Sequence, residues 1–182
     1  MHATLCDLMA DIVQNAVEAT ATKIELTIRE TKEHLEFEVR DNGKGMNSEI
    51  QAKAIDPFYS DGRKHARRRV GLGLPFLFQT AEAAGGNASI ESQEGLGTVI
   101  RFQANAQHVD LPPFGDFAGS AAMMLTLMSE GEMKILKTLN GEGYTLSRCE
   151  LENVIGDLRS AGNLKLLRTY IASQEEDLRK AG

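Results

Sequence analysis

An alternating segment that ends in a carboxylate and two closely spaced glycines constrains the fold of this chain most. Residues 35–40 (Leu-Glu-Phe-Glu-Val-Arg) alternate apolar and polar side chains, which predicts a strand buried on one face. Residues 41–46 (Asp-Asn-Gly-Lys-Gly-Met) then predict a sharp turn. An ionised Asp41 can only accept hydrogen bonds, and Gly43 and Gly45 would let the backbone approach a flat ligand. A plain turn is the simpler explanation of these six residues taken alone.

Composition and charge limit the classes of protein to consider. The chain has 182 residues, of which 42% are hydrophobic and 25% charged, as expected for one globular domain with or without a small appendage. The net charge of −6 gives no general affinity for nucleic acid or anionic membranes. The N-terminus has no basic segment, and no apolar run approaches the roughly 20 residues that span a bilayer. We therefore expect a cytoplasmic protein without nucleic-acid or membrane partners, in which Cys6 and Cys149 are free thiols.

An amphipathic helix is predicted over residues 4–19. Its apolar side chains fall on one face at helical spacing, and the opposite face carries Asp7, Asp11, Asn15 and Glu18. A solvated surface would explain that polar stripe. Alternatively, Asp11 and Asn15, one turn apart, point into a site. There the Asn15 oxygen could ligate Mg²⁺, and the Asp11 carboxylate could hold or deprotonate a water molecule.

A basic segment and a pair of glycines precede another predicted helix. Residues 60–70 lack a hydrophobic period and are rich in Arg and Lys, which predicts a loop. It could be merely solvated, bind nucleic acid, or form a lid whose cations reach phosphates; the acidic net charge disfavours nucleic acid. Gly71 and Gly73 lead into a helix that begins near Pro75. Free N–H groups at such a helix start can bind an anion, although glycines also precede helices that bind nothing.

Three hairpins complete the predicted architecture. They pair residues 23–29 with 35–40, residues 87–92 with 98–104, and residues 133–139 with 144–147. Short or amphipathic helices are predicted over residues 48–55, 117–128, 149–158 and 164–178. This order favours an α+β sandwich whose mixed, mostly antiparallel sheet carries its helices on one face. The prolines and glycine of residues 110–115 mark a boundary, so we expect a main domain over residues 1–108 and a small α/β extension over residues 109–182.

Four motifs in a fixed order resemble the N box and the three glycine boxes of the GHKL ATPases, a superfamily that includes histidine-kinase catalytic domains, DNA gyrase and mismatch-repair proteins. They are residues 11–19 (Asp-Ile-Val-Gln-Asn-Ala-Val-Glu-Ala), 41–45 (Asp-Asn-Gly-Lys-Gly), 71–74 (Gly-Leu-Gly-Leu) and 95–98 (Gly-Leu-Gly-Thr). Residues 56–59 (Asp-Pro-Phe-Tyr) resemble the phenylalanine box of sensor kinases. The resemblance covers about residues 4–104 and implies a Bergerat-type sandwich that binds ATP.

The resemblance also implies roles for individual residues. Asn15 would bind the Mg²⁺ that bridges the triphosphate, and Asp41 would accept a hydrogen bond from the adenine amino group. Thr98 would assist Asp41 through water, and residues 60–70 would form the ATP lid. Gly43 and Gly45 would line the adenine pocket, and the backbone at Gly71 and Gly73 would meet the phosphates. The other implied ATP-binding residues are Met46, Phe58, Leu72 and Leu74.

Two departures from the family pattern bear on activity. Asp11 stands where ATP-hydrolysing members carry Glu, and its shorter side chain predicts slow hydrolysis. The motif region begins close to Met1, and none of the four histidines lies on a convincing helix, so we expect a stand-alone domain without its own phospho-acceptor. The expected function is Mg²⁺-dependent ATP binding with phosphate transfer to a separate partner protein. The alternatives are a slow ATP hydrolase that drives a partner interaction, with Asp11 as its catalytic residue, or a non-catalytic nucleotide sensor.

Overall fold

The computed structural model describes residues 4–55 and 73–181, which contain six helices and six strands. In chain order these elements are α1 (Leu5–Glu18), β1 (Lys23–Glu30), β2 (His34–Asp41), α2 (Ser48–Ile55), α3 (Gly73–Ala83), β3 (Asn87–Gln93), β4 (Gly97–Asn105), α4 (Phe117–Leu125), β5 (Glu132–Leu139), β6 (Glu142–Ser147), α5 (Arg148–Ile155) and α6 (Ala161–Ala181).

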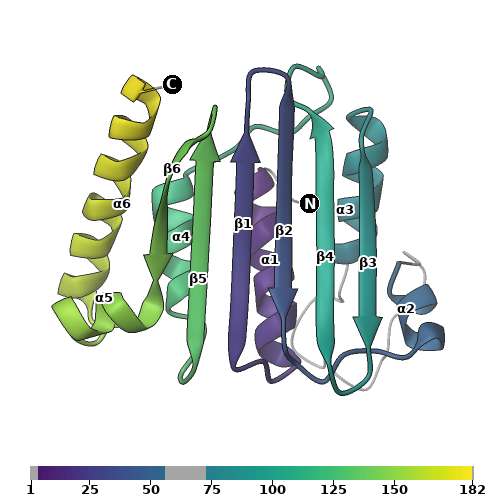
Figure 1. The fold of residues 1–182 in the computed structure, drawn as a ribbon, viewed down its shortest axis with the longest axis horizontal. Coiled ribbons are helices and arrows are strands. Elements are labelled where there is room, and N and C mark those ends of the chain that lie inside the picture. The colour runs from purple at the N-terminus through teal and green to yellow at the C-terminus, as the bar shows by residue number, and fades with distance from the viewer. Residues whose placement is uncertain (1–3, 56–72, 182) are drawn as a thin grey trace.

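The strands form one sheet in the order β3-β4-β2-β1-β5-β6 (Figure 1). Every neighbouring pair is antiparallel except β1 and β5, which are parallel. The three predicted hairpins are confirmed as β1–β2, β3–β4 and β5–β6. The expected mixed, mostly antiparallel sheet is therefore also confirmed.

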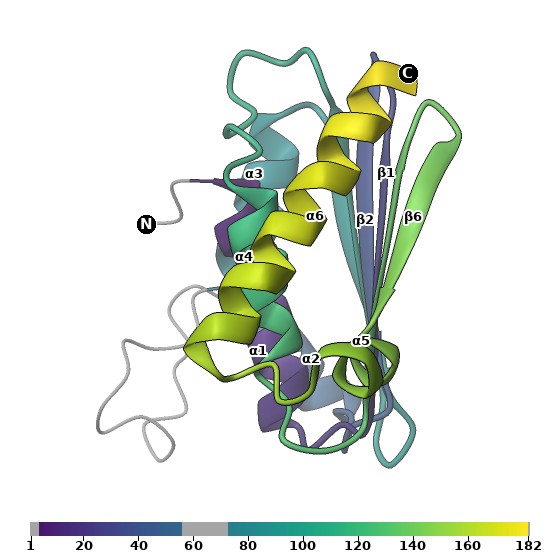
Figure 2. The same ribbon diagram turned by 90° about the vertical axis from the view of Figure 1, so that its left-hand side faces the viewer.

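The helices α1, α3, α4 and α6 all lie on one face of this sheet (Figure 2). Strand alternation explains why, because Ile24, Leu26 and Ile28 of β1 are buried toward that face, whereas Glu25 and Arg29 are exposed on the other. The hydrophobic core lies between the helices and the sheet. At its centre Phe37 and Phe102 stack with ring centroids 4.9 Å apart.

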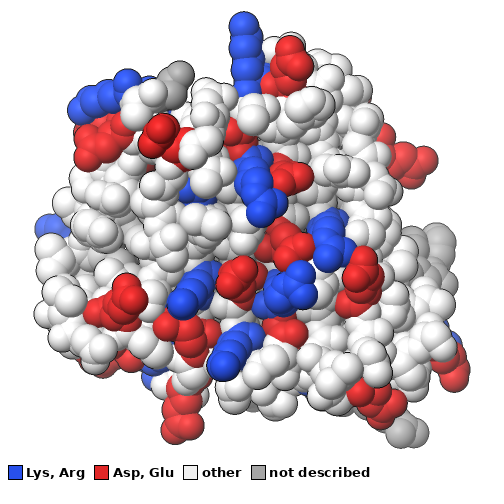
Figure 3. Space-filling model, in the orientation of Figure 1, with Lys and Arg blue, Asp and Glu red and all other residues white. Residues whose placement is uncertain are grey.

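The second face of the sheet, which we call the open face, is covered by no described helix. It carries acidic and basic side chains intermixed (Figure 3). Arg101 bonds to Glu38 at 2.6 Å and to Glu91 at 2.5 Å, and Arg29 bonds to Glu36 at 2.7 Å. Such cross-strand charge pairs keep an uncovered sheet face hydrophilic. Among the described helices, none combines the length and apolarity needed to cross a membrane.

The start of α1 is fixed from two sides. Thr4 and Asp7 form a capping box, in which each side chain accepts a hydrogen bond from the other residue's backbone N–H, at 2.9 and 3.2 Å. The next N–H groups, those of Leu5 and Cys6, donate to the carbonyls of Pro113 and Phe114 at 2.9 and 3.0 Å. The segment between β4 and α4 therefore helps to hold α1 in place on the sheet.

The region after residue 108 continues the same sheet. β5 follows β1 in parallel register from Lys23 opposite Glu132 to Glu30 opposite Leu139. Parallel neighbours need a crossover connection, and here α4 lies within it. Buried residues of α1, α4 and α6 belong to one hydrophobic cluster with those of the sheet. The division into domains at residue 108 stays a prediction.

Two C-terminal helices differ in extent from their predicted ranges. The helix predicted over residues 149–158 ends at Ile155, because Gly156 follows with φ +82°. The helix predicted over residues 164–178 begins three residues earlier, at Ala161, where the Ser160 hydroxyl accepts a hydrogen bond from the Asn163 N–H at 3.3 Å. α4 also ends earlier than predicted, at Leu125.

Candidate functional site

A row of three polar residues crosses β3, β4 and β2 near one end of the sheet. Register places Ser92 opposite Thr98, and Thr98 opposite Asp41. Because side chains alternate along a strand, these three share the face of buried Ile90, Ile100 and Val39, which is the helix face. The carboxylate and both hydroxyls therefore point toward the layer that contains α1 and α3.

The Asp41 carboxylate is half-buried and held by backbone donors. The Gly43 N–H donates to its Oδ1 at 2.7 Å. Burial raises the pKa of Asp41, and hydrogen bonds from the backbone N–H groups of Gly43 and Thr98 partly offset that rise. The result is a carboxylate that is partly shielded from water and well suited to accept a hydrogen bond from a ligand.

The glycine turn after Asp41 is packed against the end of α1. The Lys44 N–H donates to the Ala19 carbonyl at 3.0 Å, and a Cβ added to Gly43 would lie 2.8 Å from the Ala19 Cβ. Gly45 has φ +62°, and a Cβ there would overlap the carbonyl of Gln93. Close backbone approach therefore requires glycine at both positions. A role of Gly43 and Gly45 in ligand contact stays a prediction.

The polar stripe of α1 meets the start of α3. A Cβ added to Gly73 would lie 3.3 Å from the Asp11 Cβ and 3.9 Å from the Asn15 Nδ2. Asp11, Asn15 and Ala19 follow one another at intervals of four residues, so they lie along one side of α1 over about 12 Å. The glycine turn thus lies at one end of this stripe and Gly73 at the other. Leu74, the next residue of α3, is buried.

The remaining predicted site residues fall into two groups. Met46 is half-buried, packs against the core, and donates its N–H to the Ser92 hydroxyl at 2.8 Å. Phe58, Gly71 and Leu72, together with the predicted lid, lie outside the described residues.

Residues 2–108 match the model of the family described as histidine kinase-, DNA gyrase B-, and HSP90-like ATPase. The chain belongs to this family. It therefore contains a histidine-kinase-like ATPase domain, and ATP is the ligand expected for it.

Curated relatives of this ATPase domain include several kinases. The chain is 29% identical to the sensor histidine kinase YvrG of Bacillus subtilis over 96 residues, which cover 51% of this chain and 17% of that protein. It is 32% identical to sporulation kinase C of Bacillus subtilis over 99 residues, covering 53% of this chain and 22% of the relative. With the sensor kinase CckA of Brucella abortus, identity is 24% over 148 residues, or 73% of this chain and 15% of the relative. The chain thus spans less than a quarter of each of these proteins.

One solved structure, described as the N-terminal domain of a DNA repair protein, has the same fold. Its TM-score is 0.59 at 15% sequence identity, and the superposition covers 90% of this chain and 59% of the other. The superposition includes most of the chain, so the fold similarity extends beyond the family match at residues 2–108.

A Mg²⁺ ion in this ATPase domain would need ligands from the nucleotide as well as from the protein. The described residues hold no group of three or more His, Cys, Asp or Glu side chains that could bind a metal ion. Asn15, beside Asp11, could provide one oxygen ligand on the stripe next to Gly73. Mg²⁺ is commonly held by one or two protein oxygens together with substrate phosphates and water, so this limited set of ligands fits that ion.

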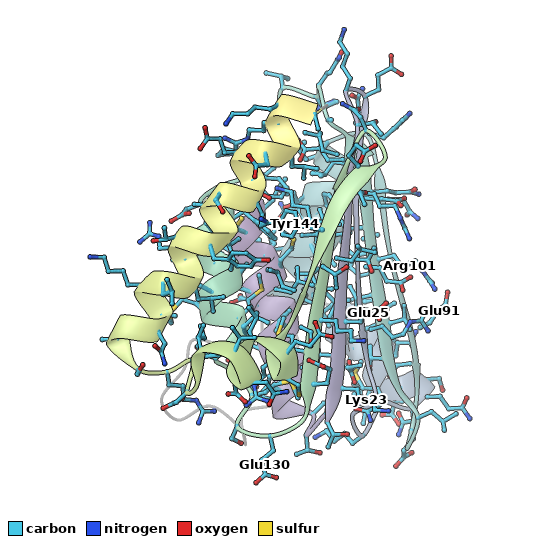
Figure 4. All side chains as sticks on the ribbon, turned by 60° about the vertical axis from the view of Figure 1, so that its left-hand side comes forward. Lys23, Glu25, Glu91, Arg101, Glu130 and Tyr144 are labelled. Carbon is cyan, nitrogen blue, oxygen red and sulfur yellow. The ribbon has the colours of Figure 1, made fainter. Side chains whose placement is uncertain are left out.

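A separate hollow of about 730 Å³ lies on the open face. Its charged lining includes Lys23, Glu25, Arg40, Glu91 and Lys134, in which neither sign dominates. Figure 4 shows Lys23, Glu25 and Glu91 projecting from the sheet away from the helices. Asp41 and Thr98 are also part of the lining, but strand alternation points their side chains to the helix face. The side chains of these two predicted site residues therefore point away from this hollow.

Ser92 is the site residue that sequence reasoning missed. In the sequence it is one polar residue between Glu91 and Gln93 near the end of an alternating strand, and nothing distinguishes it from these polar neighbours. Its position opposite Thr98 follows from the β3–β4 register, which a shift of one residue would have changed.

Proposed function

We propose that this ATPase domain binds ATP together with Mg²⁺ along the polar stripe of α1 and transfers the γ-phosphate to a separate protein. The observation that carries the proposal is the arrangement along α1. Gly73 lies against Asp11 and Asn15 at one end, and Asp41 lies with the glycine turn beside Ala19 at the other. A base at Asp41 and phosphates at the start of α3 would then share one side of a single helix.

In this proposal each residue contributes by binding or orienting. Asp41 accepts a hydrogen bond from the adenine amino group, assisted by Thr98, while Gly43, Gly45 and Met46 line the base pocket. The backbone N–H groups at the start of α3 face the phosphates, where the helix dipole favours negative charge. Asn15 ligates Mg²⁺, which neutralises phosphate charge. Phe58, Gly71 and Leu72 are assigned to the same site on the family resemblance.

The proposal places the phospho-acceptor on a separate protein, and it can be compared with the two histidines that lie in the described residues. His34 is the first residue of β2, and His108 lies in the turn between β4 and α4. Neither is on a helix exposed for phosphorylation. The kinase names of several relatives support a phosphotransfer role.

Slow ATP hydrolysis is the second candidate, and Asp11 is the observation that favours it. Its carboxylate lies beside Gly73, where the terminal phosphate would be, and could orient a water molecule for attack. The side chain is one methylene shorter than Glu, so we expect hydrolysis to be slow.

Incubation with ATP labelled on the γ-phosphate distinguishes these functions. Steady release of labelled phosphate by the purified protein, abolished by Asp11→Asn, would support hydrolysis. Transfer of label to a second protein, abolished by Asn15→Ala, would support the kinase role. Binding without either product would contradict both and leave a nucleotide sensor. Glu25→Gln, on the open face, is the matched control and should behave as the unmodified protein.

A further inference from the structure

We propose that Ser92 is a positioning residue for base recognition: it fixes the hydroxyl proton of Thr98 so that Thr98 presents only acceptor lone pairs to the base. Asp41 and Thr98 would then form an acceptor pair that selects a purine with an amino group at position 6. This inference rests on the proposed nucleotide site and assigns its base specificity.

Ser92 links three parts of the site through its hydroxyl oxygen. The Met46 N–H donates to Ser92 Oγ at 2.8 Å. Ser92 Oγ lies 3.1 Å from the Gly97 carbonyl oxygen and 2.8 Å from Thr98 Oγ1. The glycine turn, the start of β4 and the Thr98 side chain therefore all meet at this one atom.

The direction of each hydrogen bond follows from counting protons. A serine hydroxyl has one proton and two lone pairs. The Gly97 carbonyl can only accept, so it takes the Ser92 proton, and the Met46 N–H can only donate, so it occupies one lone pair. The other lone pair remains for Thr98, which must donate its own proton. This is the one assignment in which all three hydrogen bonds form.

Thr98 is consequently an acceptor toward the pocket. It is 7% exposed and stands next to Asp41 in the same cross-strand row, while its backbone N–H is directed to the Asp41 carboxylate. An amino group at position 6 of a purine can donate to this pair of acceptors. An oxo group at position 6 is itself an acceptor, so it would face the two acceptors Asp41 and Thr98 and receive no hydrogen bond from either. Leaving such a polar group without a hydrogen bond in a shielded site is unfavourable.

Removal of the Ser92 hydroxyl would free the Thr98 proton. The Thr98 hydroxyl could then rotate and donate to an oxo group at position 6. Ser92→Ala should therefore weaken discrimination between amino and oxo purines, in addition to any general loss from the missing Met46 contact. The general loss affects both nucleotides, so the ratio of affinities isolates the effect on Thr98.

The test compares the affinities of ATP and inosine triphosphate, each with Mg²⁺, by calorimetry. These nucleotides differ in the group at position 6 of the purine and, with it, at N1, which carries a proton in inosine triphosphate but not in ATP. The unmodified protein should prefer ATP, and Ser92→Ala should reduce that preference about fivefold, as expected for one neutral hydrogen bond. Ser92→Thr keeps the hydroxyl and should retain the preference. Ser89→Ala, on the same strand but facing the open side, is the matched control and should leave the ratio unchanged.

A double-mutant comparison tests whether Ser92 acts through Thr98. In a Thr98→Val background, Ser92→Ala should cause no further change in the ratio. A reduction in that background, or an equal loss of both affinities in Ser92→Ala itself, would overturn the inference and leave Ser92 a structural residue. If Ser92→Ala does not fold, Thr98→Val alone must still reduce the preference. Equal binding of both nucleotides by the unmodified protein would refute the inference alone, whereas binding of neither would refute the proposed site.

Discussion

Asp41 combines two demands that oppose each other in a single side chain. Its carboxylate is half-buried, which disfavours the charged form in the folded protein. The same charge makes it a strong acceptor for a ligand donor. Functional sites are the places where such conflicts with stability are expected.

Asp41→Asn should separate these two effects. The amide oxygen can still accept from the Gly43 N–H, but the negative charge is lost. We predict that ATP affinity falls by about 1.5–3 kcal/mol, the range for a hydrogen bond to a charged group. The free energy of unfolding of the ligand-free protein at pH 7 should not fall. Calorimetric titration and thermal unfolding measure the two quantities. Unchanged ATP affinity would show that Asp41 does not contact the base, and Glu25→Gln is the matched acid-to-amide control on the open face.

The raised pKa of Asp41 also predicts a pH dependence. A carboxyl with a raised pKa binds its proton at a higher pH in the folded state than in the unfolded chain. The unfavourable contribution of ionised Asp41 to stability is therefore present at neutral pH and disappears as the pH falls through that pKa.

ATP binding should change in the opposite sense, because it needs the ionised form. We predict that, as the pH is lowered, ATP affinity begins to decline at a pH above about 3.9, the usual pKa of aspartate. The measurement is the ATP affinity of the unmodified protein and of Asp41→Asn from about pH 7 to about pH 4.5. The difference between the two affinities is compared across this range, because any effect of protonating the nucleotide itself is common to both proteins and cancels. A constant difference over that range would contradict the assignment.

The sequence could predict Asp41 and its glycines because a charged residue at the end of an alternating segment, followed by Gly-x-Gly, is a local signal. It could not predict Ser92, whose role depends on which residue of β4 lies opposite. The same holds for the contact of Gly73 with Asp11 and Asn15, which joins segments about 60 residues apart in the chain. The family resemblance nevertheless predicts that both segments belong to one site.

Among the elements, α6 is attached to the sheet by a buried polar cluster. Lys137 of β5 bonds to Glu175 of α6 at 2.6 Å, and their side chains are 5% and 9% exposed. The Lys137 ammonium also lies 4.4 Å from the ring centroids of Phe114 and Phe117. Tyr144 of β6 lies between α6 and the sheet (Figure 4) and donates to the same carboxylate at 2.5 Å. Burial and the Glu175 carboxylate raise the pKa of Tyr144, so its hydroxyl stays protonated and can donate.

Breaking this pair from one side should be strongly destabilising. Lys137→Met leaves a buried carboxylate without its cation, and Glu175→Gln leaves a buried ammonium without its anion. We predict that each lowers the free energy of unfolding by about 3 kcal/mol, as for other buried ion pairs that lose one partner. The double variant should lose less than the sum of the two, because no unpaired charge remains and the introduced amide oxygen can still accept from Tyr144. Chemical denaturation measures the free energy of unfolding of the two single variants and the double variant.

Lys134→Met is the matched control for this cycle. Lys134 lies on the same strand but faces the open side and is exposed, so its substitution should change stability by no more than about 0.5 kcal/mol. Additive losses in the double variant would mean that Lys137 and Glu175 do not stabilise α6 as a pair.

Hairpins and helices of this chain could be predicted from the sequence, because their signals are local: alternation, helical spacing and turn residues. The parallel pairing of β1 with β5 could not, since residues more than 100 positions apart meet there with no turn to indicate it. Buried Lys137 was missed for a related reason, because a lysine in a strand gives no sign that its partner lies on a distant helix.

For the whole molecule, the central question is whether residues 109–182 fold separately. β5 completes the hydrogen bonding of β1, and a single hydrophobic cluster includes residues from both sides of position 108. We predict one cooperative thermal transition in calorimetry, with equal calorimetric and van't Hoff enthalpies. Two resolved transitions would instead show that the regions unfold as independent domains.

The most direct test of the proposed function is a calorimetric titration of the protein with ATP in the presence of Mg²⁺, performed in parallel on Asp41→Asn. We predict saturable binding at one site that is markedly weaker in the variant. Absence of binding by a folded, unmodified protein, or equal binding by both proteins, would contradict the assignment of Asp41 and the glycine turn to a nucleotide site.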